Sequence, residues 1–185
     1  MKFIDPRTKP RDPWHGIDGD DGPMVTLTPA PYSLLTLLQW LGVRNHWPQA
    51  MMVGVRLAND VEVNEIAADL PRLSLVAFQF PKWTDGRAYS QAKLLRSRYR
   101  YAGQIRAIGE VLVDMLPLLQ RTGFDAVAMR SDQSRDAAER SLGFFRGHYQ
   151  GDAVESRPLF GLPPGLADAL AREPVREFVD AGDSI

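Results

Sequence analysis

Residues 73–99 read LSLVAFQFPKWTDGRAYSQAKLLRSRY, and this stretch decides the fold. Its first eight residues form the most apolar strand pattern in the chain. A polar turn containing Asp85 and Gly86 follows. Apolar side chains then recur at spacings of three and four, which is typical of one face of a helix: Tyr89, Ala92, Leu95 and Tyr99. The stretch therefore predicts a buried strand followed by an amphipathic helix.

The same strand–helix pattern occurs four times in succession. The predicted strands cover residues 52–57, 73–80, 105–108 and 126–129. The predicted helices cover about 61–70, 89–99, 112–121 and 133–145. Such alternation indicates an α/β fold of four consecutive βα units with a parallel sheet. Periodicity leaves two arrangements open, a half-barrel and an open doubly wound sheet.

The segments on either side of these units are less regular. Residues 1–23 are rich in Pro, Gly and Asp, and we expect an irregular arm with one short strand at 1–4. A strand at 24–28 and a helix at 34–41 follow, with Ser33 as the helix cap and Gly42 at its end.

Four prolines interrupt residues 158–185, which allow one short helix at 166–172. We therefore divide the chain into an N-terminal arm and helix, a βα core and a Pro/Gly-rich C-terminal tail, at residues 1–50, 51–150 and 151–185.

Composition excludes several function classes. The chain has 22 basic and 23 acidic side chains, and this balance argues against a general nucleic-acid binder. Cysteine is absent, which excludes disulfides, zinc–thiolate sites and cysteine-ligated iron–sulfur clusters. There is no apolar signal region and no run of 18 apolar residues, so we expect a cytoplasmic protein without a membrane partner.

Common cofactor and catalytic motifs are also missing. Neither the G-x-G-x-x-G nor the G-x-x-x-x-G-K-[ST] fingerprint occurs, so the cofactor stays unknown. The histidines His15, His46 and His148 are scattered, and we expect no metal site. Ser90 has no histidine near it in the sequence, which disfavours a Ser–His nucleophile.

Basic side chains follow or lie within successive predicted strands. Ligands of parallel α/β sheets bind beyond the carboxyl ends of the strands. Guanidinium groups near helix N-termini suit a small oxyanion such as sulfite, sulfate, phosphate or a carboxylate. The predicted binding residues are Arg56, Lys82, Arg87, Ser90 and Arg106, and Arg130 could join them. In the alternative interpretation the arginines form structural ion pairs with Asp85, Glu110, Asp114, Asp125 and Asp132.

The run FPKWTDGRAYSQAKLLR, residues 80–96, resembles a bacterial family known as domain of unknown function 934. The resemblance continues through GQIRAIGEVLVDML and RTGFDA, residues 103–116 and 121–126, and covers roughly residues 50–150. The matching positions are Phe80, Pro81, Asp85, Gly86, Arg87, Tyr89, Ser90, Arg96, Arg106, Gly109, Asp114, Gly123, Phe124 and Asp125. Trp83, Glu110 and Met115 stand where Phe, Asp and Gln are usual.

The resemblance implies a role in assimilatory sulfite reduction. Members often carry the label of an oxidoreductase because their genes accompany those of sulfite reductase. On this basis the protein is either an enzyme, with Asp85 and Asp114 as proton-handling or arginine-orienting groups, or a non-catalytic partner of sulfite reductase. The partner would dock through Trp83, the loop at 81–90 or the tail. A third alternative is a regulatory domain that binds a small anion. A homodimer would cover the open edge of the sheet.

Overall fold

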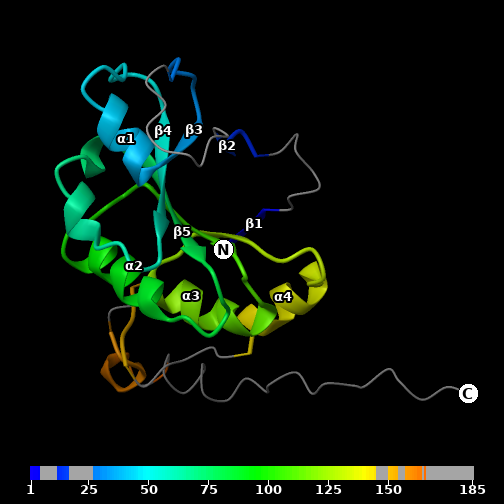
Figure 1. Ribbon diagram of the computed structural model, residues 1–185. Helices are drawn as coiled ribbons and strands as arrows, with labels where there is room; N and C mark the ends of the chain where they lie inside the picture. The colour runs from blue at the N-terminus through cyan, green and yellow to red at the C-terminus, as the bar shows by residue number, and fades with distance from the viewer. Residues whose placement is uncertain (5–11, 17–26, 145–149, 154–156, 164, 166–185) are drawn as a thin grey trace, which may run out of the picture.

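Seven parallel strands form one curled sheet, a half-barrel, in the described part of the chain (Figure 1). This computed structural model describes residues 1–4, 12–16, 27–144, 150–153, 157–163 and 165. The strands are β1 Lys2–Ile4, β2 His15–Gly16, β3 Ser33–Thr36, β4 Val53–Ala58, β5 Leu73–Phe80, β6 Gln104–Gly109 and β7 Ala126–Ala128. Across the sheet they lie in the order β1-β7-β6-β5-β4-β3-β2.

The strand order explains why the sheet is a half-barrel and not doubly wound. Strands β2 to β7 lie side by side in chain order. Right-handed connections between such neighbours place every connecting helix on the same face. The helices are α1 Leu37–Val43, α2 Arg87–Ser97, α3 Leu116–Thr122 and α4 Arg135–Leu142. Figure 1 shows α2, α3 and α4 side by side along one side of the sheet.

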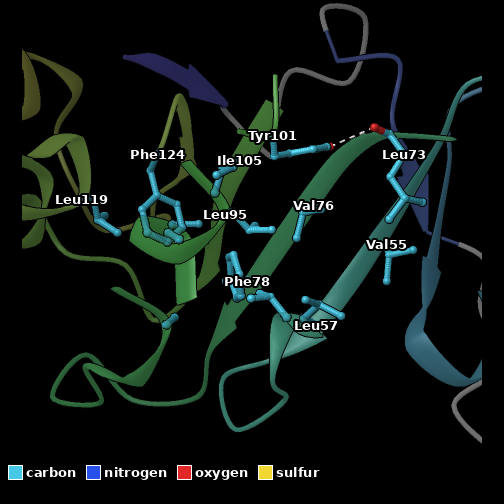
Figure 2. Packing of buried hydrophobic residues seen from close by; sticks show 14 of the residues in the cluster. Val55, Leu57, Leu73, Val76, Phe78, Leu95, Tyr101, Ile105, Leu119 and Phe124 are labelled. Carbon is cyan, nitrogen blue, oxygen red and sulfur yellow. Dashed lines mark hydrogen bonds between the residues drawn. The ribbon is translucent and has the colours of Figure 1, made fainter. Parts of the chain in front are cut away.

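The hydrophobic core lies between the sheet and these helices. Alternate strand residues point into it, including Val55, Val76 and Phe78, and they are fully buried. Leu95 of α2 and Leu119 of α3 close the core from the helix side (Figure 2). The apolar strand residues therefore pack against the helices on one face of the sheet. The strand residues between them point to the opposite face.

The prediction of a helix over residues 61–70 is wrong. Two 3₁₀ turns occupy this connection, η2 Val63–Ile66 and η3 Leu70–Arg72. Val63 and Ile66 are buried as an amphipathic helix would require. Pro71 disfavours the α conformation in the residue before it, so the segment stays short and tight.

The helix predicted over residues 34–41 begins later than expected. Residues 33–36 form β3, which pairs with β4, and α1 follows. The cap is Thr36 and not Ser33, because the Thr36 hydroxyl accepts from the Gln39 backbone N–H while the Gln39 side chain accepts from the Thr36 N–H. Gly42 lies inside the helix, which ends at Val43.

The other predicted elements follow the structure closely. The strand at residues 1–4 is confirmed as β1. The third predicted helix starts as a 3₁₀ turn, η4 Val113–Met115, and becomes α3 at Leu116. Of the predicted strand at 24–28, only residues 27 and 28 are described, and they are not in a strand. Phe145 and the helix predicted at 166–172 lie outside the described residues.

No described helix is long and apolar enough to cross a membrane.

Candidate functional site

A row of basic and small side chains crosses the sheet in register. Arg56 of β4 pairs with Ala77 of β5, and Ala77 pairs with Arg106 of β6. The row continues through Ala126 of β7 to Lys2 of β1. Neighbouring residues in a parallel sheet point to the same side, so Arg56, Arg106 and Lys2 share one face. We call these three residues the basic row.

The basic row lies on the face opposite the helices. Arg56 stands between Val55 and Leu57, whose side chains belong to the core, so its own side chain points the other way. The same alternation holds for Arg106, between Ile105 and Ala107. Among the described residues no helix packs on this face (Figure 1). The sheet alone therefore sets the spacing of the basic row.

Arg106 is the most enclosed member of the basic row. Its side chain is only 4% exposed. Its two terminal nitrogens donate to the two carboxylate oxygens of Asp12 at 2.7 and 3.0 Å, and one of them also donates to the Gln104 side chain at 2.9 Å. The third nitrogen, Nε, is buried and has no hydrogen-bond acceptor among the described residues. Arg56 is half-buried, whereas Lys2 is exposed.

The loop after β5 does not join the basic row. Asp85 accepts from the Arg87 guanidinium at 3.0 and 2.7 Å and from the Arg87 backbone N–H at 3.3 Å. The pair lies at the start of α2, whose N-cap is Gly86, in agreement with the alternative that Arg87 forms a structural ion pair with Asp85. The Arg87 guanidinium lowers the pKa of Asp85 to about 2. Asp85 therefore stays ionised near neutral pH, where it is a poor proton donor or general base.

Arg130 is held in the same way at the end of β7. It donates to Glu110 at 2.9 Å and also pairs with Asp132, so its charge is shared by two carboxylates. These contacts raise the pKa of Arg130 and lower that of Asp132. The alternative interpretation, in which the arginines form structural ion pairs, thus describes both Arg87 and Arg130.

The remaining predicted site residues are spread over the surface. Lys82 and Ser90 are exposed, on the loop after β5 and on α2. Asp114 is exposed in the 3₁₀ turn before α3. Trp83 is 57% exposed, whereas Trp40 and Trp47 belong to the core. Arg56 and Arg106 share the sheet face, whereas Lys82, Arg87 and Ser90 lie on the loop after β5 and on α2.

Arg96 organises several of the residues on which the family resemblance rests. Its guanidinium donates to the backbone carbonyls of Tyr101, Gly103 and Gly123. It also pairs with Asp125, whose carboxylate accepts from the Ile105 backbone N–H. This network joins the end of α2 to the starts of β6 and β7, which is a structural role.

The aromatic residues of the matching segments pack together. Phe80, Tyr89 and Phe124 have ring centroids 5.5 to 6.4 Å apart. They seal the core where β5 meets α2, and burial raises the pKa of Tyr89. Most of the long motif after β5 is therefore explained by packing and by the Asp85–Arg87 ion pair.

Metal binding finds no support in the described residues, which contain no group of three or more His, Asp or Glu side chains placed to hold an ion. His15 and His46 are both exposed, and His148 lies outside the described residues.

Sequence reasoning missed Lys2 and Asp12, because their relation to Arg106 depends on strand register and on a contact across 94 positions.

The fold and this face define an all-parallel α/β half-barrel with a basic row on the side opposite its helices. The chain belongs to a family of bacterial proteins of unknown function, DUF934, whose model matches residues 54–160. The match spans more than half of the 185 residues. No curated protein matches it.

Proposed function

We propose that this protein binds a small oxyanion on the sheet face that carries the basic row. The observation behind the proposal is the register that aligns Arg56, Arg106 and Lys2 on the face opposite the described helices. Arginine binds the oxygens of carboxylates, phosphates and sulfur oxyanions through paired N–H groups, which gives such a face its selectivity for oxyanions.

The residues between the basic side chains favour binding as well. Neighbouring strands are about 4.8 Å apart, so Arg56 and Arg106 are separated by roughly 10 Å across β5. Ala77, whose small side chain is itself fully buried, occupies the position between them. An anion above Ala77 would be within the reach of both guanidinium groups. The free Nε–H of Arg106 would supply a donor that no described residue uses.

We further propose that the anion is a sulfur oxyanion and that the protein acts in sulfite reduction as a non-catalytic partner of sulfite reductase. The family resemblance supports this context. The chain lacks cysteine and the common dinucleotide fingerprints, so its own residues do not provide a cysteine-ligated electron carrier. Asp85, a candidate for proton transfer, is held ionised by Arg87. These points favour binding over catalysis.

Calorimetric titration with sulfite, sulfate and phosphate tests the proposal. We expect Arg56→Gln and Arg106→Gln each to weaken binding at least tenfold. The matched controls, Arg87→Gln and Arg130→Gln, remove arginines that lie outside the basic row, and we expect affinities within twofold of the parent. Loss of binding in the controls alone, or no binding of any of the three anions to the parent protein, would refute the proposal.

An oxidoreductase is the second candidate function, and the exposed Trp83 bears on the choice. A large apolar side chain 57% exposed on the loop after β5 suits docking to a protein partner. The partner hypothesis expects a purified protein without absorbance between 300 and 600 nm and retention of sulfite reductase that Trp83→Ala abolishes. A flavin or haem band, or turnover of sulfite by the protein alone, would favour the enzyme instead.

A further inference from the structure

The acidic partner of Arg106 comes from a distant part of the chain. Asp12 lies 94 positions earlier, yet its carboxylate faces the guanidinium with two oxygens on two nitrogens. A small oxyanion is bound by arginine with this same fork geometry. The Asp12 carboxylate therefore occupies the position at Arg106 where the proposed function requires the oxygens of an anion.

The segment that carries Asp12 lies on the sheet face through one aromatic anchor. Gly54 of β4 lies on the same face as the basic row, and a Cβ built there would stand 3.0 Å from the Trp14 ring. Trp14 also meets the edge of the Tyr32 ring, with centroids 5.5 Å apart. The missing side chain at position 54 therefore lets the indole pack directly against the sheet.

The remaining attachment of this segment is slight. Strand β2 consists of two residues, His15 and Gly16, and both are exposed. His15 donates its backbone N–H to Tyr32 at 3.2 Å. Short edge pairings of this kind open at low free-energy cost, so the segment can leave the face without unfolding the sheet.

The energetics of the ion pair make a replacement ligand necessary. A guanidinium as buried as that of Arg106 needs a negatively charged partner, because an uncompensated buried charge is strongly destabilising and Gln104 supplies only a neutral acceptor. An incoming oxyanion can replace the carboxylate, and it can also accept from Nε, which the carboxylate leaves unused. Exchange of one acceptor for the other keeps the buried charge paired throughout.

We propose that residues 12–16 form an internal competitor, in which the Asp12 carboxylate occupies Arg106 until a small oxyanion displaces it. This inference rests on the proposed function and adds its regulation. Anion binding is then coupled to release of Trp14 from Gly54, so the surface around β2 and β3 differs between the free and the bound protein. A partner protein that binds this surface would therefore distinguish the anion-bound from the free protein.

Titration of Asp12→Asn with sulfite and phosphate tests the competitor. The amide keeps the shape of the side chain and removes its charge, so we expect the affinity to rise at least tenfold. Asp132→Asn is the matched control, because it removes a carboxylate from Arg130 at the rim, and we expect no change. If Asp12→Asn melts far below the parent, Trp14→Phe serves instead: it loosens the anchor, keeps the carboxylate, and should raise the affinity severalfold.

Trp14 fluorescence reports the displacement directly. The difference spectrum between the parent and Trp14→Phe isolates this indole from the other three tryptophans, and we expect it to shift towards that of an exposed indole as anion is added. Binding to the parent with no gain in Asp12→Asn and no Trp14 shift would overturn the competitor and leave the proposed function intact. If neither the parent nor Asp12→Asn binds an anion, both fail. Binding by Asp12→Asn alone would refute both for the natural chain, because the anion then fails to displace the Asp12 carboxylate.

Discussion

Gly109 ends β6 in the left-handed region, with φ at +94°. A Cβ at this position would lie 2.5 Å from the backbone oxygen of Phe80. That oxygen accepts from the Glu110 backbone N–H at 2.9 Å, so it cannot move away cheaply. The glycine is thus required by the backbone, which explains its presence among the positions that match the family without any role in binding.

Gly109→Ala should lower the free energy of unfolding by at least about 2 kcal/mol, because it adds both backbone strain and a steric clash. Gly16→Ala is the control, since a Cβ at Gly16 meets nothing within 4 Å. Urea denaturation followed by circular dichroism measures both. If the two variants were equally stable, the close approach of Gly109 to the Phe80 backbone oxygen would be refuted.

The charge of Asp85 depends on Arg87. Its folded-state pKa of about 2 lies below the ordinary 3.8, so this pair stabilises the protein above pH 3.8 and loses its contribution as the pH falls towards 2. Arg87→Gln should return the pKa of Asp85 towards 3.8, and Arg130→Gln should leave it unchanged. Carboxyl-carbon NMR titration checks this. A pKa of Asp85 near neutrality would instead revive its role in proton transfer.

At the scale of elements, the guanidinium of Arg96 connects α2 with two strands. Arg96→Met should destabilise the protein by about 2–3 kcal/mol, since three backbone carbonyls and Asp125 lose a charged donor. Arg98→Met, two residues further on and exposed, is the control and should cost less than about 0.5 kcal/mol. Thermal unfolding of the two variants decides. Similar losses would mean that the Arg96 network does not stabilise the connection.

Element type was predictable where packing and local preference agree. The strand at residues 73–80 coincides with β5, because six of its eight residues are apolar and suit a buried strand. Residues 34–41 misled the prediction because Leu34, Leu35, Leu38 and the residues between also fit a helical period. The T-L-L-Q run from Thr36 to Gln39 is a capping-box signature and could have located the true helix start.

At the scale of the whole molecule, the basic row depends on register, which no periodicity supplies. Sequence reasoning placed Arg56 and Arg106 among the candidates but assumed that they reach the rim at the carboxyl ends of the strands. Both lie in the middle of their strands, and the alternation of side chains places them on the face opposite the helices. Asp12 could not be foreseen, because it contacts Arg106 from a segment without any sequence period.

A crystal structure with a bound oxyanion would show whether the basic row is the binding site. Crystals of the full chain grown with selenate, a tetrahedral anion with an anomalous signal, would locate it without ambiguity. We expect an anomalous peak above Ala77, between Arg56 and Arg106, with Asp12 displaced from the guanidinium of Arg106. A peak at Arg87 or Arg130 with the face above Ala77 unoccupied, or no peak at saturating selenate, would contradict it.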